Sequence, residues 1–142
     1  MADMTVISLG GSLIAPDAVD TGFLASFHRL AAGYLDADSR RKLIVICGGG
    51  GLARRYQGAC RELNPSATND DLDWIGIAAT RVNAELVRRM FGSHCAGGVV
   101  IDPTAARKLA GRVMVAAGWK PGFSTDNDAV ILARRFGAGT LV

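Results

Sequence analysis

Residues 42–56, KLIVICGGGGLARRY, decide the fold that we expect for this chain. The apolar residues Leu43 to Cys47 run into the glycines Gly48 to Gly51, and a basic helical pattern follows at once. A buried strand that ends in glycine and opens a helix forms an anion site, because the backbone approaches a ligand closely and the first helical N–H groups lack partners. Arg54 and Arg55 follow, where a guanidinium reaches phosphate oxygens. The stretch predicts a site for a phosphorylated small molecule; the alternative is a plain strand-to-helix turn.

Length and composition favour a single α/β domain over residues 1–142. Hydrophobic residues make up 49% of the chain and aromatic residues only 6%, so Val, Ile, Leu and Ala must build the core. Such a core fits helices on a parallel sheet better than a β-sandwich. The net charge of +3 comes from 16 basic and 13 acidic residues without a basic, aromatic cluster. We therefore expect no nucleic-acid partner.

The cysteines Cys47, Cys60 and Cys95 are odd in number and form no C-x-x-C motif. Buried, reduced thiols in a cytoplasmic protein are the expected state, and we expect no metal site. The N-terminus lacks the pattern of a signal peptide, and no apolar run approaches the roughly 20 residues of a membrane helix. A cytoplasmic protein without a membrane partner is the prediction.

A unit of strand, glycine loop and helix recurs along the chain. Strands are predicted at 5–9, 42–47 and 112–117, with shorter ones at 99–101 and 140–142. Helices are predicted at 21–34, 52–63, 70–91 and 125–136, and a turn or short helix at 102–109. Asp70 and Asp71 are expected to supply the N-cap and the first-turn charge of the longest helix. The alternation predicts a parallel sheet covered on both faces, with a binding crevice at the carboxyl ends of its strands.

Two general nucleotide-binding motifs do not account for the glycine run. The chain has no G-x-x-x-x-G-K-[ST] sequence, which disfavours a P-loop NTPase. Gly48, Gly50 and Ala53 satisfy the dinucleotide pattern G-x-G-x-x-A. That pattern also requires an acidic residue at the end of the next strand, whereas Asp70 to Asp73 open a helix. We interpret the dinucleotide match as accidental.

Four segments in order carry a more specific resemblance. They are LGGSL (9–13), CGGGGLARRY (47–56), DWIGIAATRVNAELV (73–87) and GWKPGFSTDNDAV (118–130). Together they resemble the amino acid kinase superfamily and, within it, the archaeal-like branch of the uridylate kinases. The resemblance implies a three-layer α/β sandwich with a mainly parallel sheet, of which this chain is the acceptor-binding part. It further implies a cytoplasmic homo-oligomer, a hexamer, that transfers the γ-phosphoryl group of ATP to UMP with Mg²⁺ in pyrimidine biosynthesis.

The resemblance also assigns substrate-binding residues. These are Gly49, Gly50, Arg54, Asp73, Gly118, Ser124 and Thr125. The glycine run and the loop that ends at Thr125 match two contacts with the UMP phosphate, and Asp73 matches the carboxylate that holds the ribose. Each assignment has a structural alternative: a tight turn for the glycines and helix capping for Asp73.

Catalytic positions follow from the same resemblance. Gly10, Gly11 and Asp126 match catalytic positions, and Gly10 and Ser12 match the loop that contacts the transferred phosphoryl group of ATP. A first-turn helix charge is the alternative role of Asp126. For Arg81 and Asn83 of the family helix, a packing role and a ligand role both stay open.

Two departures from the family pattern affect function. Ser8 stands where many members have a catalytic lysine, so the cation that phosphoryl transfer needs is expected from Mg²⁺ and a residue outside this chain. The family's ATP site follows the helix that begins at Thr125, and the sequence ends at Val142 as that half begins. Truncation is the expected explanation, ahead of a split protein or a degenerate module. A kinase for another small acceptor and a non-catalytic nucleotide or oxyanion storage module are the alternative functions.

Overall fold

A parallel sheet forms the centre of the computed structural model, which describes residues 2–106 and 108–142. Within these residues, four strands pair in the order β3-β2-β1-β4. They are β1 (Asp3–Leu9), β2 (Arg41–Cys47), β3 (Val113–Ala116) and β4 (Thr140–Leu141). Every pairing is parallel, and Leu9 lies opposite Cys47. The glycine loops after β1 and β2 therefore leave the sheet side by side, as predicted.

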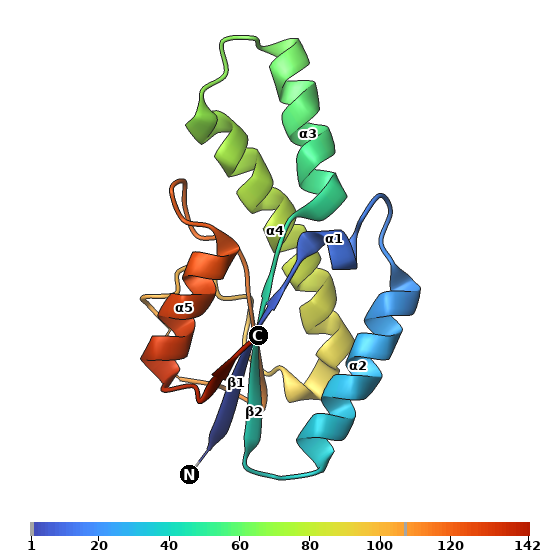
Figure 1. Cartoon of the computed structure of the whole chain (residues 1–142), viewed down its shortest axis with the longest axis vertical. Coiled ribbons are helices and arrows are strands. Elements are labelled where there is room, and N and C mark those ends of the chain that lie inside the picture. The colour runs from blue at the N-terminus through green and yellow to red at the C-terminus, as the bar shows by residue number, and fades with distance from the viewer. Residues whose placement is uncertain (1, 107) are drawn as a thin grey trace.

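Helices cover both faces of this sheet. They are α1 (Gly11–Ile14), α2 (Thr21–Asp36), α3 (Gly50–Leu63), α4 (Asn69–Phe91), α5 (Thr125–Phe136) and the 3₁₀ turn η1 (Gly92–His94). Figure 1 shows α2 on one side of the strands and α5 on the other, while α3 and α4 extend together beyond the carboxyl ends of the strands. The three-layer α/β fold is confirmed. In the described ranges, no helix has both the length and the apolar character that crossing a membrane requires.

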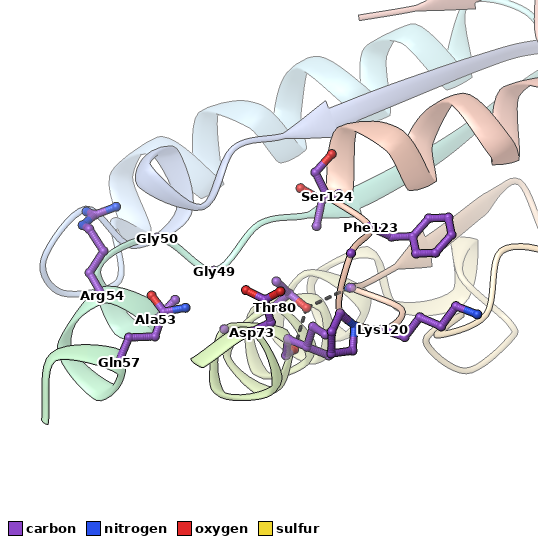
Figure 2. Close-up of a pocket in the computed structure, with 16 residues that line it drawn as sticks. Gly49, Gly50, Ala53, Arg54, Gln57, Asp73, Thr80, Lys120, Phe123 and Ser124 are labelled. Atoms are coloured by element: carbon purple, nitrogen blue, oxygen red, sulfur yellow. Dashed lines mark hydrogen bonds between the residues drawn. The ribbon is translucent and has the colours of Figure 1, made fainter. Parts of the chain in front are cut away.

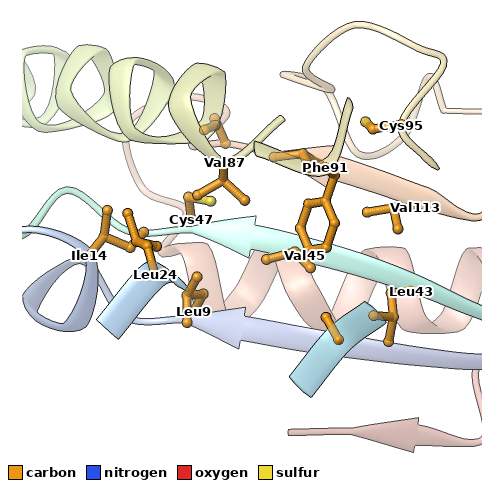
Figure 3. Close-up of a cluster of buried hydrophobic side chains, with 14 of the residues drawn as sticks. Leu9, Ile14, Leu24, Leu43, Val45, Cys47, Val87, Phe91, Cys95 and Val113 are labelled. Carbon is orange, nitrogen blue, oxygen red and sulfur yellow. The ribbon is translucent and has the colours of Figure 1, made fainter. Parts of the chain in front are cut away.

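Strand β2 explains why both faces of the sheet are apolar. Leu43, Val45 and Cys47 point into a cluster with α2 and α4, shown in Figure 3. Ile44 and Ile46 point the opposite way, into a cluster with α5. Alternate side chains of a strand face opposite sides, so an unbroken apolar run is buried on both. Each fully buried Leu, Ile or Val contributes about 1.5–3 kcal/mol, which anchors the loops at the strand ends.

The longest helix begins with a capping box. Thr68 Oγ1 accepts a hydrogen bond from the backbone N–H of Asp71 at 3.1 Å, and the Asp71 carboxylate accepts one from the Thr68 N–H at 2.8 Å. The N-cap is therefore Thr68, and the assignment of that role to Asp70 or Asp71 was wrong. Thr68 has the extended backbone that lets a short hydroxyl reach back to the third helical residue. Asp70 and Asp71 do lie in the first turn.

Three local predictions also differ from the structure. The loop predicted after β1 contains the short helix α1, and α3 begins at Gly50 instead of Leu52. The strand predicted at 99–101 is only an isolated bridge between Val100 and Ala116, since the chain leaves the sheet edge on both sides of it. Of the turn or short helix predicted at 102–109, the turn is confirmed at 103–105, the described residues form no helix there, and Arg107 lies outside the described residues.

Candidate functional site

A cavity of about 460 Å³ opens at the carboxyl ends of the strands. Its walls are the start of α3, the first half of α4, and the loop of residues 118–124 that leads into α5, as Figure 2 shows. All of the predicted substrate-binding residues line it: Gly49, Gly50, Arg54, Asp73, Gly118, Ser124 and Thr125. Residues that lie far apart in the sequence thus share one cavity.

The first wall is the glycine loop after β2 with the start of α3, and its backbone packing requires residues without side chains. Gly50 has a φ of +60°, which favours glycine. A Cβ on Gly49 would lie 2.7 Å from the Cβ of Ala53, and a Cβ on Gly11 would lie 2.1 Å from the backbone N of Gly50. The loops after β1 and β2 therefore pack backbone against backbone, and this contact places the amino-terminal end of α3 at the cavity.

The two neighbouring arginines of α3 have different surroundings. Arg54 lines the cavity and donates to Ser12 Oγ at 3.3 Å and to the carbonyl of Pro16 at 3.2 Å. Both acceptors are neutral, and no acidic group of the described chain pairs with Arg54. Arg55 instead forms an ion pair with Asp17 and does not line the cavity. Arg54 is thus the arginine whose charge is available to a ligand.

The loop of residues 118–124, called the second wall below, is held in place by α4. Thr80 Oγ1 accepts from the N–H of Gly118 at 2.8 Å, and Arg81 Nη2 donates to the carbonyl of Trp119 at 3.0 Å. Lys120 lies over the rings of Trp119 and Phe123, with 4.2 Å from Nζ to the Trp119 centroid. In Figure 2 the side chain of Lys120 points away from Arg54 and Gly50. Sequence reasoning missed Thr80, although a threonine inside a long helix is a signal of side-chain bonding to backbone.

The predicted catalytic residues lie beside the cavity and not in its lining. Gly10 is the exposed N-cap of α1, and Gly11 is buried under the glycine run. Asp126, in the first turn of α5, accepts a hydrogen bond from Ser8 Oγ at 2.6 Å. The carboxyl end of β1 and the amino end of α5 thus bring Gly10, Ser8 and Asp126 to the same edge of the sheet. In residues 2–106 and 108–142, no three His, Cys, Asp or Glu residues cluster as metal ligands would.

A buried carboxylate lies in the first turn of α5, near the backbone of Trp119. Asp128 of α5 has no exposed surface, and neither of its oxygens has a hydrogen-bond partner within the described part of the chain. Burial raises the pKa of Asp128 to about 6, while the nearby Trp119 backbone amide acts in the opposite direction. No sequence signal points to the burial of Asp128, because an acidic residue in a first helical turn is normally exposed.

Comparison with known proteins places the chain in a family. The model of the amino acid kinase family matches residues 3–142. The uridylate kinase of Thermoplasma acidophilum is 35% identical over 143 residues, an alignment that covers 100% of this chain and 60% of that protein. The uridylate kinase of Methanosarcina acetivorans is 36% identical over 140 residues, covering 97% and 58%. The chain therefore spans about 60% of the length of such relatives.

Solved structures agree with this placement. The crystal structure of uridylate kinase from Archaeoglobus fulgidus matches with a TM-score of 0.81 and 34% identity, covering 96% of this chain and 60% of that one. Aspartate kinase from Synechocystis shares the fold, with a TM-score of 0.77 at 13% identity. The resemblance inferred from the four sequence segments is confirmed, and the chain belongs to the amino acid kinase family.

Proposed function

We propose that the chain binds UMP as the acceptor-binding part of a uridylate kinase, which transfers the γ-phosphoryl group of ATP to UMP and forms UDP. The observation that carries the proposal is the convergence of two helix N-termini on one cavity. The start of α3 contributes Gly49 and Gly50, and the start of α5 contributes Thr125. The partial positive charges of two helix ends favour a phosphate dianion. The relatives named uridylate kinase point to the same acceptor.

The orientation of UMP follows from the chemistry of the lining. The phosphate lies between the glycine run with Arg54 and the loop that ends at Thr125, because these groups supply N–H donors and a positive charge. Asp73 is exposed on the opposite part of the lining, where its carboxylate accepts hydrogen bonds from the ribose hydroxyls. A phosphate oxygen then faces the edge with Gly10, Gly11 and Asp126. Transfer in line, without a covalent enzyme intermediate, needs positioning and electrostatics and no nucleophilic side chain.

Gly10 and Ser12 are proposed to contact ATP. A Cβ on Gly10 would meet no atom within 4 Å, so the space beside its backbone is open to a phosphate. Mg²⁺ bound with ATP would supply positive charge at the transferring group, and Asp126, whose carboxylate lies at this edge, would be the residue of this chain that holds it. Assembly as a homo-oligomer, a hexamer by resemblance, and a cytoplasmic location belong to the same proposal.

Titration calorimetry with UMP, CMP, AMP and ATP tests the proposed acceptor. We expect this chain to bind UMP and to prefer it over the other three nucleotides. Binding of no nucleotide by a folded sample would contradict the proposal. Preference for ATP over UMP would also contradict it. Binding of inorganic oxyanions without nucleotide preference would instead support a storage module.

A further inference from the structure

One turn of α4 holds two other walls of the cavity, the glycine loop after β2 and the loop of residues 118–124. The Asn83 side-chain amide donates to the carbonyl of Gly48 at 2.8 Å and to that of Gly49 at 3.2 Å. Two residues earlier, the Arg81 guanidinium donates to the carbonyls of Gly118 and Trp119 at distances of 3.0–3.3 Å. The two loops are about 70 residues apart in the sequence, and a single rigid helix bonds the backbone of each.

Burial makes these bonds hard to replace. Asn83 is 3% exposed, and its bond to Gly48 is buried. Arg81 is half-buried. A buried carbonyl that loses its donor carries a desolvation cost, because water does not reach it readily. Without Arg81 or Asn83, each loop would therefore move to find other donors.

The bonds also orient the opposite side of each peptide. The C=O and N–H of one trans peptide plane point in opposite directions. Since the carbonyls of Gly48 and Gly49 point at Asn83, the N–H groups of Gly49 and Gly50 point away from it. Both residues line the cavity, and neither N–H has a hydrogen-bond partner in the described chain. Asn83 thus turns two donors outward without touching a ligand itself.

We infer that Arg81 and Asn83 are positioning residues, which set the orientation of the two phosphate-contacting loops and the separation between them. This inference rests on the proposed function, in which both loops contact the UMP phosphate. Asn83 acts on the loop after β2, and Arg81 acts on the loop before α5. Neither residue is in the lining of the cavity, so each acts through the backbone that it holds.

Matched variants separate this role from general stabilisation. Arg81→Met keeps most of the apolar stem and removes the donors, whereas Arg81→Lys keeps one cationic donor and should restore part of the effect. Arg89→Met is the control, since Arg89 lies on the same helix with an exposed side chain. Asn83→Leu is close in shape and lacks a donor, and Asn83→Ala serves if that variant does not fold. Asn69→Leu, at the exposed start of α4, is its control.

Hydrogen exchange of the ligand-free chain, followed by mass spectrometry, measures the amide exchange rate of each loop separately. We expect Arg81→Met to speed exchange in residues 118–125 and to leave 48–53 unchanged. We expect the reverse for Asn83→Leu. Faster exchange throughout the molecule would overturn the inference, because it would indicate only a structural role. Unchanged exchange in either loop would overturn it as well.

Calorimetric titration with UMP provides the second measurement. Each variant should bind UMP about tenfold more weakly than the wild type, and each control should stay within about twofold. Wild-type affinity in a variant whose loop exchanges faster would overturn the inference. Failure of the wild type to bind UMP would refute the proposed function and the claim about UMP, whereas the exchange data would still decide whether α4 holds the loops.

Discussion

Ser8 at the end of β1 donates a hydrogen bond to Asp126 at the start of α5, with 2.6 Å between Oγ and Oδ1. The two residues are 118 positions apart in the sequence. Ser8 stands where the family resemblance leads us to expect a catalytic lysine, and here a neutral hydroxyl contacts the aspartate beside the predicted transfer site. The pair lies next to the acceptor cavity and outside its lining.

This separation predicts that acceptor binding does not depend on the pair. Ser8→Ala and Asp126→Asn should each bind UMP within about twofold of the wild type, because neither side chain lines the cavity. Thr125→Val, one residue before Asp126, should weaken binding, since it removes the hydroxyl of a residue that lines the cavity. Titration calorimetry that measures the UMP affinity of the three variants tests this prediction. A large loss of affinity in Ser8→Ala would place the phosphate closer to β1 than we propose.

Arg54 should supply much of the affinity for phosphate. Arg54→Ala removes a charged donor from the cavity, and hydrogen bonds of charged groups contribute about 1.5–3 kcal/mol, so UMP affinity should fall by about tenfold to a hundredfold. Arg55→Ala is the matched control, because Arg55 pairs with Asp17. The affinity for uridine, which has no phosphate, should not change in either variant. A greater loss in Arg55→Ala would assign the phosphate to Arg55.

The buried Asp128 should make stability depend on pH. Its pKa is raised from 3.8 to about 6, so the folded chain holds a proton that the unfolded chain releases. Stability contributed by this group is therefore complete below about pH 4, declines as the pH rises to about 6, and stays low above that. Asp128→Asn should raise Tm at pH 7.5 by about 6–12 °C and should change Tm little at pH 4.

Thermal unfolding between pH 4 and pH 8 measures this effect, with the exposed Asp126→Asn as control. Hydrogen bonds lower the pKa values of Asp38, Asp71 and Asp102 below 3.8, so their stabilising contributions begin to be lost as the pH falls below about 5. The wild type and each variant share this loss, so the difference in Tm between Asp128→Asn and the wild type at each pH isolates the effect of Asp128. Equal shifts of Tm at both ends of the range would mean that Asp128 is not protonated in the fold.

Substitution by alanine should reduce the stability of the fold at Gly11 and not at Gly10. A Cβ on Gly11 would lie 2.1 Å from the Gly50 nitrogen, against backbone that has no room to move, so Gly11→Ala should destabilise by about 1–3 kcal/mol or more. A Cβ on Gly10 would meet nothing within 4 Å, so Gly10→Ala should leave stability nearly unchanged. Urea denaturation compares the two. Equal losses would mean that the backbone contact between the glycine loops is not the constraint.

Local signals in the sequence were sufficient for most of the fold. The apolar run before Gly48 predicts a central strand, and the match of α5 to 125–136 follows from Ser124 at its start and Gly137 at its end. Helix α1 was missed because Gly11–Ile14 is four residues long and has no side-chain cap. Val100 was placed in a strand because its neighbours are apolar, but it reaches the sheet at a single bridge.

The parts of the site that depend on long-range contacts could not be predicted from the sequence. The glycine loops predicted a phosphate site and a crevice at the carboxyl ends of parallel strands, whereas the individual substrate-binding residues were assigned by the resemblance to the family. The roles of Thr80, Arg81 and Asn83 depend on which backbone N–H and carbonyl groups lie within 3.5 Å of them, 34 to 38 residues away in the sequence. No local pattern contains that information. The burial of Asp128 likewise depends on how the loop of residues 118–124 packs over α5.

The most direct test of UMP binding in this cavity is a titration of the ¹⁵N-labelled chain with UMP, followed by amide chemical shifts. UMP should shift the amides of Gly49, Gly50 and Thr125 most, in a saturable manner. Uridine should shift them much less, because these donors face the phosphate. Saturable shifts centred elsewhere, or no shifts at millimolar UMP, would contradict the proposed acceptor site.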